Sequence, residues 1–127
     1  WAECNWSSKS GVQAIKKLFK QYPEMDAVFA ANDQMALSVV QYACRKGVRV
    51  PQDLGVVGFD DLPESEFFWP PLTTIQQDQY NVGEVAVEEV IKIIESGWHE
   101  HGPVRPKTIM LAPTLVVRQS SLKRKGQ

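Results

Sequence analysis

The spacing of apolar residues alternates between a helical and a strand-like pattern along the chain. In residues 10–22, apolar side chains recur every three or four positions and lysines occupy the opposite face, which is typical of an amphipathic helix. Residues 33–46 repeat this spacing, and residues 80–96 show it most clearly. Ser7 or Ser8 can cap the first helix, because a short hydroxyl accepts from the free amides of a first turn.

Short apolar runs lie between these helices. Residues 26–31 and residues from about 54 to 59 each predict a strand that is apolar on both faces, as in the interior of a parallel sheet. Residues 73–77, 107–113 and 114–120 predict shorter extended segments. Helices and strands that alternate with short connections indicate an α/β fold, a parallel sheet flanked by helices.

The segment of residues 60–72, "DDLPESEFFWPPL", predicts a loop with one helical turn, because its three prolines exclude a long helix. Its "EFFW" sequence is a cluster of large apolar residues in a loop, which suggests a contact surface. The loop can equally fold back on its own core.

Composition narrows the functional classes. The 127 residues carry 14 basic and 15 acidic side chains, for a net charge of −1, whereas a nucleic-acid-binding module usually has a basic excess. Cys4 and Cys44 form neither a disulfide framework nor a zinc pattern, which favours a reducing, cytoplasmic compartment. No apolar run reaches membrane-spanning length. We expect His99 and His101 to be loop residues rather than metal ligands.

No catalytic or cofactor-binding pattern stands out. The chain has no glycine-rich phosphate loop, no nucleophile elbow and no convincing Ser/His/Asp or Cys/His arrangement. We therefore expect a non-enzymatic protein without a cofactor.

Polar side chains follow two of the predicted strands directly. Asn32 and Asp33 follow the first in "AAND", and Asp60 and Asp61 follow the second in "GFDD". The carboxyl ends of neighbouring parallel strands lie side by side, and ligands bind there in open α/β sheets. Each residue also has a structural interpretation. Asn32 or Asp33 can cap the next helix, and the Asp60–Asp61 pair can form a turn.

Trp6 and Gln77 lie in further polar breaks of the pattern, although a core or lid position for Trp6 and an ordinary loop for Gln77 remain alternatives. Together with Asn32 and Asp60 they suit a polyhydroxylated ligand. An indole covers the C–H face of a sugar or nucleoside ring. A carboxylate accepts from two hydroxyls, and a carboxamide both donates and accepts.

The order of several sequence blocks resembles the lactose-repressor (LacI/GalR) family of bacterial transcription regulators. The blocks cover nearly the whole chain at the family's usual spacing: "NWSSKSGVQAI", "DAVFAANDQMAL", "KGVRVPQDLGVVGFDD", "PPLTTIQQD", "VGEVAVEEVIKII" and "LAPTLVVRQSS". Members commonly have Gly-Asp where Cys4 and Asn5 stand.

The resemblance implies roles for individual residues. Trp6 matches the aromatic that stacks on the effector, Asn32 the amide that hydrogen-bonds it, Asp60 the carboxylate that binds its hydroxyls, and Gln77 a residue of the cleft. Gln79 stands where some members place a second aromatic. Leu37, Phe67 and Phe68 match positions that contact a second subunit, so a homodimer is implied.

The resemblance also implies a periplasmic binding protein-like fold of type I, with two lobes and an effector between them. Residues 1–74 then belong to the second lobe, 75–112 to the first lobe, and 113–127 to a return crossing with a basic tail. Operator DNA would be bound only through a helix-turn-helix head that these residues do not include. The alternative is part of a periplasmic sugar-binding protein that serves uptake.

A lobe that is only partly represented should leave apolar surface without a partner. We therefore expect the apolar faces of residues 80–96 and 107–112 to be exposed.

Overall fold

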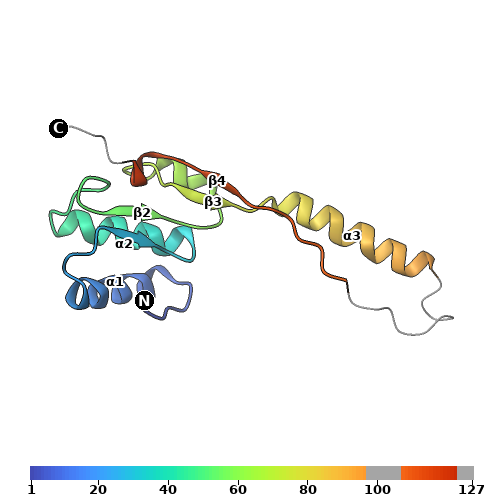
Figure 1. The fold of residues 1–127 in the computed structure, drawn as a ribbon, viewed down its shortest axis with the longest axis horizontal. Coiled ribbons are helices and arrows are strands. Elements are labelled where there is room, and N and C mark those ends of the chain that lie inside the picture. Colours follow the sequence, from blue (N-terminus) through green and yellow to red (C-terminus); the bar gives the residue numbers. More distant parts are fainter. Residues whose placement is uncertain (97–106, 123–127) are drawn as a thin grey trace. The chain divides into compact units, whose positions relative to one another are not determined.

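The computed structural model describes residues 1–96 and 107–122 and divides into two compact units (Figure 1). The first unit comprises Trp1–Gln76 with Thr114–Gln127, and the second comprises Gln77–Pro113. The chain therefore leaves the first unit after Gln76 and returns to it at Thr114.

The described residues of the first unit form two α-helices, four short strands and two 3₁₀ turns. In chain order these are α1 (Ser8–Gln21), β1 (Ala27–Phe29), α2 (Asp33–Arg45), β2 (Gly55–Val57), η1 (Pro63–Phe67), β3 (Thr74–Gln76), β4 (Thr114–Val116) and η2 (Gln119–Ser121). The alternation of helices and strands confirms the predicted α/β class. Gly47 has a φ of 72° just after α2, as expected of a left-handed residue that ends a helix.

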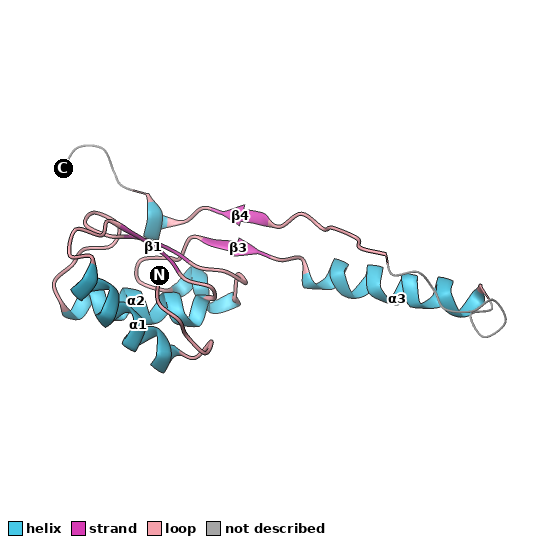
Figure 2. Cartoon of the chain, turned by 60° about the horizontal axis from the view of Figure 1, so that its bottom comes forward, coloured by secondary structure: helices cyan, strands magenta, loops and turns pink. Residues whose placement is uncertain are grey.

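The strands form two pairs that are joined by isolated bridges. β1 pairs in parallel with β2, with Phe29 opposite Val57, and β3 pairs antiparallel with β4, as Figure 2 shows for the latter pair. Beyond β2 the chain runs parallel to β3 through bridges from Val57 to Thr73 and from Asp60 to Gln76.

The core of the first unit lies between the two helices and the parallel strands. α1 and α2 approach each other closely at Gly11, where a Cβ atom would lie 3.2 Å from Met35 and from Ser38. The absence of a side chain at Gly11 therefore permits the contact. The buried apolar residues are Ile15, Ala30, Met35, Ala36, Val39, Val40, Ala43, Leu54, Val56 and Leu72.

Two strand predictions differ from the structure. β1 was expected to be buried on both faces, yet Phe29 is 62% exposed, because β1 pairs only with β2 among the described residues. Residues 107–113 form no strand. A strand needs a ladder partner for its backbone groups, and the described part of the chain provides none there.

The second unit is described by its helix α3 (Gln79–Glu95), whose N-terminus is capped by the Asp78 carboxylate at 3.0 Å from the Asn81 amide. None of the residues of α3 is buried, which confirms the expectation of an exposed apolar face. Ile94 is 66% exposed and Met110, beyond the helix, is 85% exposed. Gly97, His99 and His101 lie outside the described residues.

We expect the isolated 127-residue chain to self-associate, because exposed apolar surface costs on the order of 25 cal/mol for each Å² that remains in water. Gel filtration with light scattering over a range of concentrations measures this association. A monomer that also unfolds in one sharp transition would contradict the prediction.

Within the described residues, no helix is long and apolar enough to cross a membrane. The same residues contain no cluster of His, Cys, Asp and Glu side chains that could hold a metal ion.

Candidate functional site

Asn32 connects the start of α2 to the loop that carries Trp6. Its Oδ1 accepts from the Met35 amide at 2.8 Å, so it is the N-cap of α2. Its Nδ2 donates to the Trp6 carbonyl at 2.9 Å. The capping role left open by the sequence is thus confirmed. The amide nitrogen carries two hydrogens, and the partly exposed Asn32 uses one of them for Trp6.

Trp6 presents its side chain at the surface, with 66% of it exposed. Its φ of 67° is in the left-handed region, which is unfavourable for a bulky residue unless neighbouring contacts hold it. Asn32 provides one such contact, and the next residue, Ser7, is fixed as the N-cap of α1 through the Ser10 amide. These contacts fix the backbone from which the exposed indole projects.

Asp60 lies at the same edge of the parallel strands as Asn32. Asn32 is three positions beyond Phe29, and Asp60 is three positions beyond Val57, the residue that pairs with Phe29. The amide of Asp60 donates to the Ile75 carbonyl at 2.9 Å, and its φ is 109°. The carboxylate is partly exposed. The first unit thus holds Trp6, Asn32 and Asp60, and Trp6 and Asn32 are in direct contact.

Gln77 is the first residue of the second unit and has an exposed side chain. Its carbonyl accepts from the Gln79 amide at 2.8 Å, just ahead of α3.

The predicted subunit-contact residues differ in their exposure. Phe67 is 79% exposed. Phe68 is partly buried and packs against the core, and Leu37 is partly buried on α2. The "EFFW" loop therefore presents Phe67 and Trp69 to the surface and turns Phe68 toward the interior. Packing of the loop on its own core is confirmed for Phe68, and the contact surface at Phe67 stays a prediction.

Asp33 has a structural role that its sequence pattern did not predict, and its side chain is fully buried. Its Oδ2 accepts from the Leu62 amide at 2.9 Å and from Ser65 Oγ at 2.6 Å. Its Oδ1 accepts from Thr74 Oγ1 at 2.6 Å. The positive N-terminal end of α2, where Asp33 is the first residue, also favours the negative charge. The sequence placed Asp33 at the start of an amphipathic helix, where an acidic residue is common. It did not indicate the residues that hydrogen-bond to the Asp33 carboxylate.

Asp61 was also missed as an internal residue. Its carboxylate Oδ1 accepts from Arg118 Nη1 at 2.8 Å, with side-chain exposures of 10% for Asp61 and 20% for Arg118. Its Oδ2 accepts from Gln76 Nε2 at 2.9 Å. Of the two aspartates in "GFDD", Asp61 therefore serves the fold. The sequence did not indicate this ion pair, because Asp61 and Arg118 are 57 positions apart.

We predict that Gly58→Ala lowers the free energy of unfolding by about 2 kcal/mol or more. A Cβ atom at Gly58 would collide with Asp33 Oδ1 and lie 2.9 Å from Leu72 Cδ2. The matched control is Gly83→Ala in α3, where a Cβ meets nothing within 4 Å and alanine favours the helix. Urea denaturation of the full-length protein measures both variants. An unchanged stability for Gly58→Ala would contradict the close approach.

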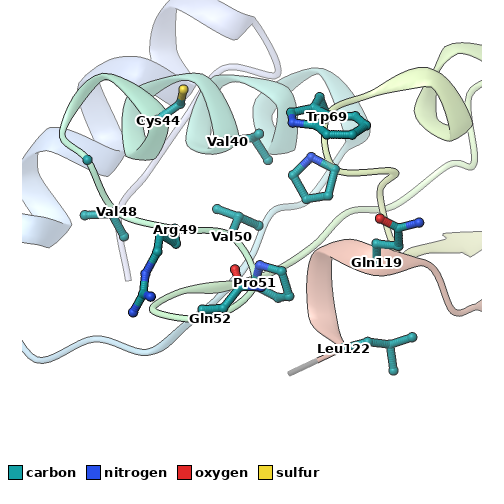
Figure 3. Close-up of a pocket in the computed structure, with 12 residues that line it drawn as sticks. Val40, Cys44, Val48, Arg49, Val50, Pro51, Gln52, Trp69, Gln119 and Leu122 are labelled. Atoms are coloured by element: carbon teal, nitrogen blue, oxygen red, sulfur yellow. The ribbon is translucent and has the colours of Figure 1, made fainter. Parts of the chain in front are cut away.

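Two hollows open on the first unit. The smaller, about 250 Å³, is apolar and is lined by Trp6, Phe29 and Met35 among other residues, but by neither Asn32 nor Asp60. The larger, about 660 Å³, lies between α2, the loop after it, Trp69 and η2 (Figure 3). It contains none of the predicted effector residues. Trp6 is thus the one residue of the predicted set that lines either hollow.

Comparison with known families identifies the class of protein to which the chain belongs. Residues 2–121 match the periplasmic binding protein-like domain, so the chain belongs to that family. Its curated relatives include transcriptional repressors. The ribose operon repressor of Bacillus subtilis (strain 168) is 34% identical over 94% of this chain. The repressor PurR of Glaesserella parasuis serovar 5 (strain SH0165) is 35% identical over 93% of it.

Solved structures agree with this assignment. The lac repressor dimer bound to operator and the anti-inducer ONPF matches 94% of this chain with a TM-score of 0.83 and 32% identity. A complex of the transcriptional regulator CelR with cellobiose matches 93% with the same TM-score and identity. The chain spans 35% of each of the two curated relatives and 40% of the lac repressor chain. It therefore corresponds to part of a LacI-type effector-binding domain.

Proposed function

We propose that the chain binds a small polyhydroxylated effector as part of a LacI-type transcriptional regulator in the cytoplasm. Trp6, Asn32 and Asp60 contribute from the first unit, and Gln77 contributes from the segment that belongs to the other lobe of the complete protein. The effector changes DNA binding by a head outside these residues, because it has different affinities for the two states of the regulator.

The observation that carries this proposal is the contact between Asn32 and Trp6. The Asn32 amide fixes the backbone of Trp6 in a left-handed conformation while the indole remains 66% exposed. An exposed aromatic face on a fixed backbone is suited to stacking on a sugar or nucleoside ring. The strand register places Asp60 at the same edge, where its carboxylate can accept from adjacent hydroxyls.

A thermal-shift screen of the full-length protein tests the proposal. The probes are D-ribose, D-galactose, cellobiose and adenine, because a compound that binds only the native state raises the melting temperature. We expect at least one of the three sugars to raise it and adenine, which has no hydroxyl group, to leave it unchanged, and we expect Asp60→Ala to abolish the shift. A shift that is unaffected by Asp60→Ala would overturn the assignment.

The proposal includes a homodimer in which Leu37, Phe67 and Phe68 lie at the contact. We predict that Phe67→Asp weakens self-association of the full-length protein by about tenfold or more, since it would place a charge in an apolar interface. Analytical ultracentrifugation measures the dissociation constant. The control is Tyr22→Asp, which changes an aromatic residue that is 54% exposed at the end of α1. Equal effects of the two variants would contradict a specific role for Phe67.

The upstream sequence distinguishes the regulator from a periplasmic binding protein that serves uptake. A helix-turn-helix head ahead of Trp1 supports the regulator. A cleavable leader there supports the alternative.

A further inference from the structure

Asp61 is held by one residue from each of the two chain segments that connect the units, β3 and the residues just after β4. Gln76, the last residue of β3, donates to its Oδ2 at 2.9 Å. Arg118, two positions after β4, donates to its Oδ1 at 2.8 Å. β3 leads directly into the second unit and β4 begins where the chain returns, so the carboxylate joins both connections.

The backbone around Asp61 adds to this arrangement. Asp60 and Asp61 have φ values of 109° and 55°, and two consecutive non-glycine residues of this kind persist only where surrounding contacts hold them. The amide of Asp61 lies 3.4 Å from Thr74 Oγ1. The next amide, that of Leu62, donates to the buried Asp33. The turn is therefore fixed through its side chains and its backbone.

Arg118 is itself firmly placed. Its amide donates to Thr73 Oγ1 at 2.8 Å, and its guanidinium also donates to the Leu72 carbonyl at 3.0 Å. The guanidinium is 20% exposed and the Asp61 carboxylate 10%. A charge-assisted hydrogen bond that is largely shielded from water is stronger than one at the surface.

We propose that Asp61 is a positioning residue that couples the orientation of Asp60 to the two chain connections between the units. A movement of the second unit shifts β3 or β4. The shift is transmitted to Asp61 by its hydrogen bonds with Gln76 and Arg118, and it changes the conformation of the turn that contains Asp60. Conversely, a ligand bound at Asp60 stabilises one arrangement of both connections. The role in effector response rests on the proposed function, but the mechanical coupling does not.

Hydrogen exchange of the full-length protein without added ligand tests the coupling. In Asp61→Asn, we expect the amides of Asp60, Leu62 and Arg118 to exchange about tenfold faster, because a charged hydrogen-bond acceptor is lost. The amides in the middle of α1 and α2 should keep their rates. A purely local role would accelerate Asp60 and Leu62 but leave Arg118 unchanged, and that result would overturn the proposal.

Substitutions in the connections supply the reverse test. Arg118→Met and the milder Gln76→Ala, which changes an exposed side chain, should both accelerate exchange at the Asp60 amide. The matched controls are Arg45→Met, at the exposed end of α2, and Glu64→Gln, an exposed carboxylate in the same loop as Asp61. If Arg118→Met fails to fold, the exchange rate of the Asp60 amide in Gln76→Ala tests the coupling. Unchanged exchange at Asp60 in the variants that fold would contradict the coupling.

The probe panel separates this proposal from the proposed function. If D-ribose or another probe raises the melting temperature of the wild type, Asp61→Asn should weaken that probe's affinity about tenfold, and Glu64→Gln should not. Equal affinities in wild type and Asp61→Asn would overturn the link to the effector. If no probe shifts the wild type, the effector assignment loses its support, while the exchange experiment still decides the coupling.

Discussion

Replacement of Asp33 by alanine is expected to lower the free energy of unfolding by about 3–5 kcal/mol. The carboxylate is fully buried and accepts from Leu62, Ser65 and Thr74. Its removal leaves three donors in the interior without an acceptor and a cavity beside Gly58. Urea denaturation of the full-length protein, monitored by circular dichroism, measures the change.

The matched control is Asp53→Ala. Asp53 also accepts from a backbone amide and from a side chain, but its partner Arg49 is 70% exposed, and exposed ion pairs contribute little to stability. If the two alanine variants unfold at the same urea concentration, the Asp33 network does not hold the loop against α2 and β3.

Replacement of Trp6 by alanine is expected to reduce effector affinity about 100-fold, since a well-placed aromatic is among the residues that contribute most to binding. The fold should remain intact because the indole is exposed and Asn32 bonds only to the backbone of Trp6. Isothermal titration of the full-length protein, with the compound that gives the largest thermal shift, measures the affinity.

Two controls accompany the Trp6 variant. Trp6→Phe keeps an aromatic face and should retain most of the affinity. Trp69→Ala removes an equally large side chain that is 89% exposed beside the larger hollow, and it should have no effect on effector binding. If Trp6→Ala binds the effector as tightly as the wild type, Trp6 does not stack on the effector.

The sequence predicted the elements that have a strong local signal. The bounds of α1, α2 and α3 differ from the predicted ones by one or two residues, because each helix has a polar cap and a continuous apolar face. β1 and residues 107–113 were less well predicted. An apolar run predicts a covered segment, but burial and strand pairing depend on partners that the run itself does not identify.

The same distinction applies to the site. The position of Asn32 and Asp60 at one edge could be predicted, because polar residues follow the apolar strands and parallel strands end at a common edge. The roles of Asp33 and Asp61 depend on partners that are 15–57 positions away in the sequence. No local pattern separates the buried Asp33 from the cap beside it, or the internal Asp61 from the proposed ligand Asp60.

A crystal structure of the full-length regulator with the compound that gives the largest thermal shift tests the central claim most directly. We expect the indole of Trp6 to lie against the carbon face of that compound, and the Asp60 carboxylate and Asn32 amide to hydrogen-bond its polar groups. A compound bound away from these three residues, for example in the hollow beside Trp69, would contradict the account.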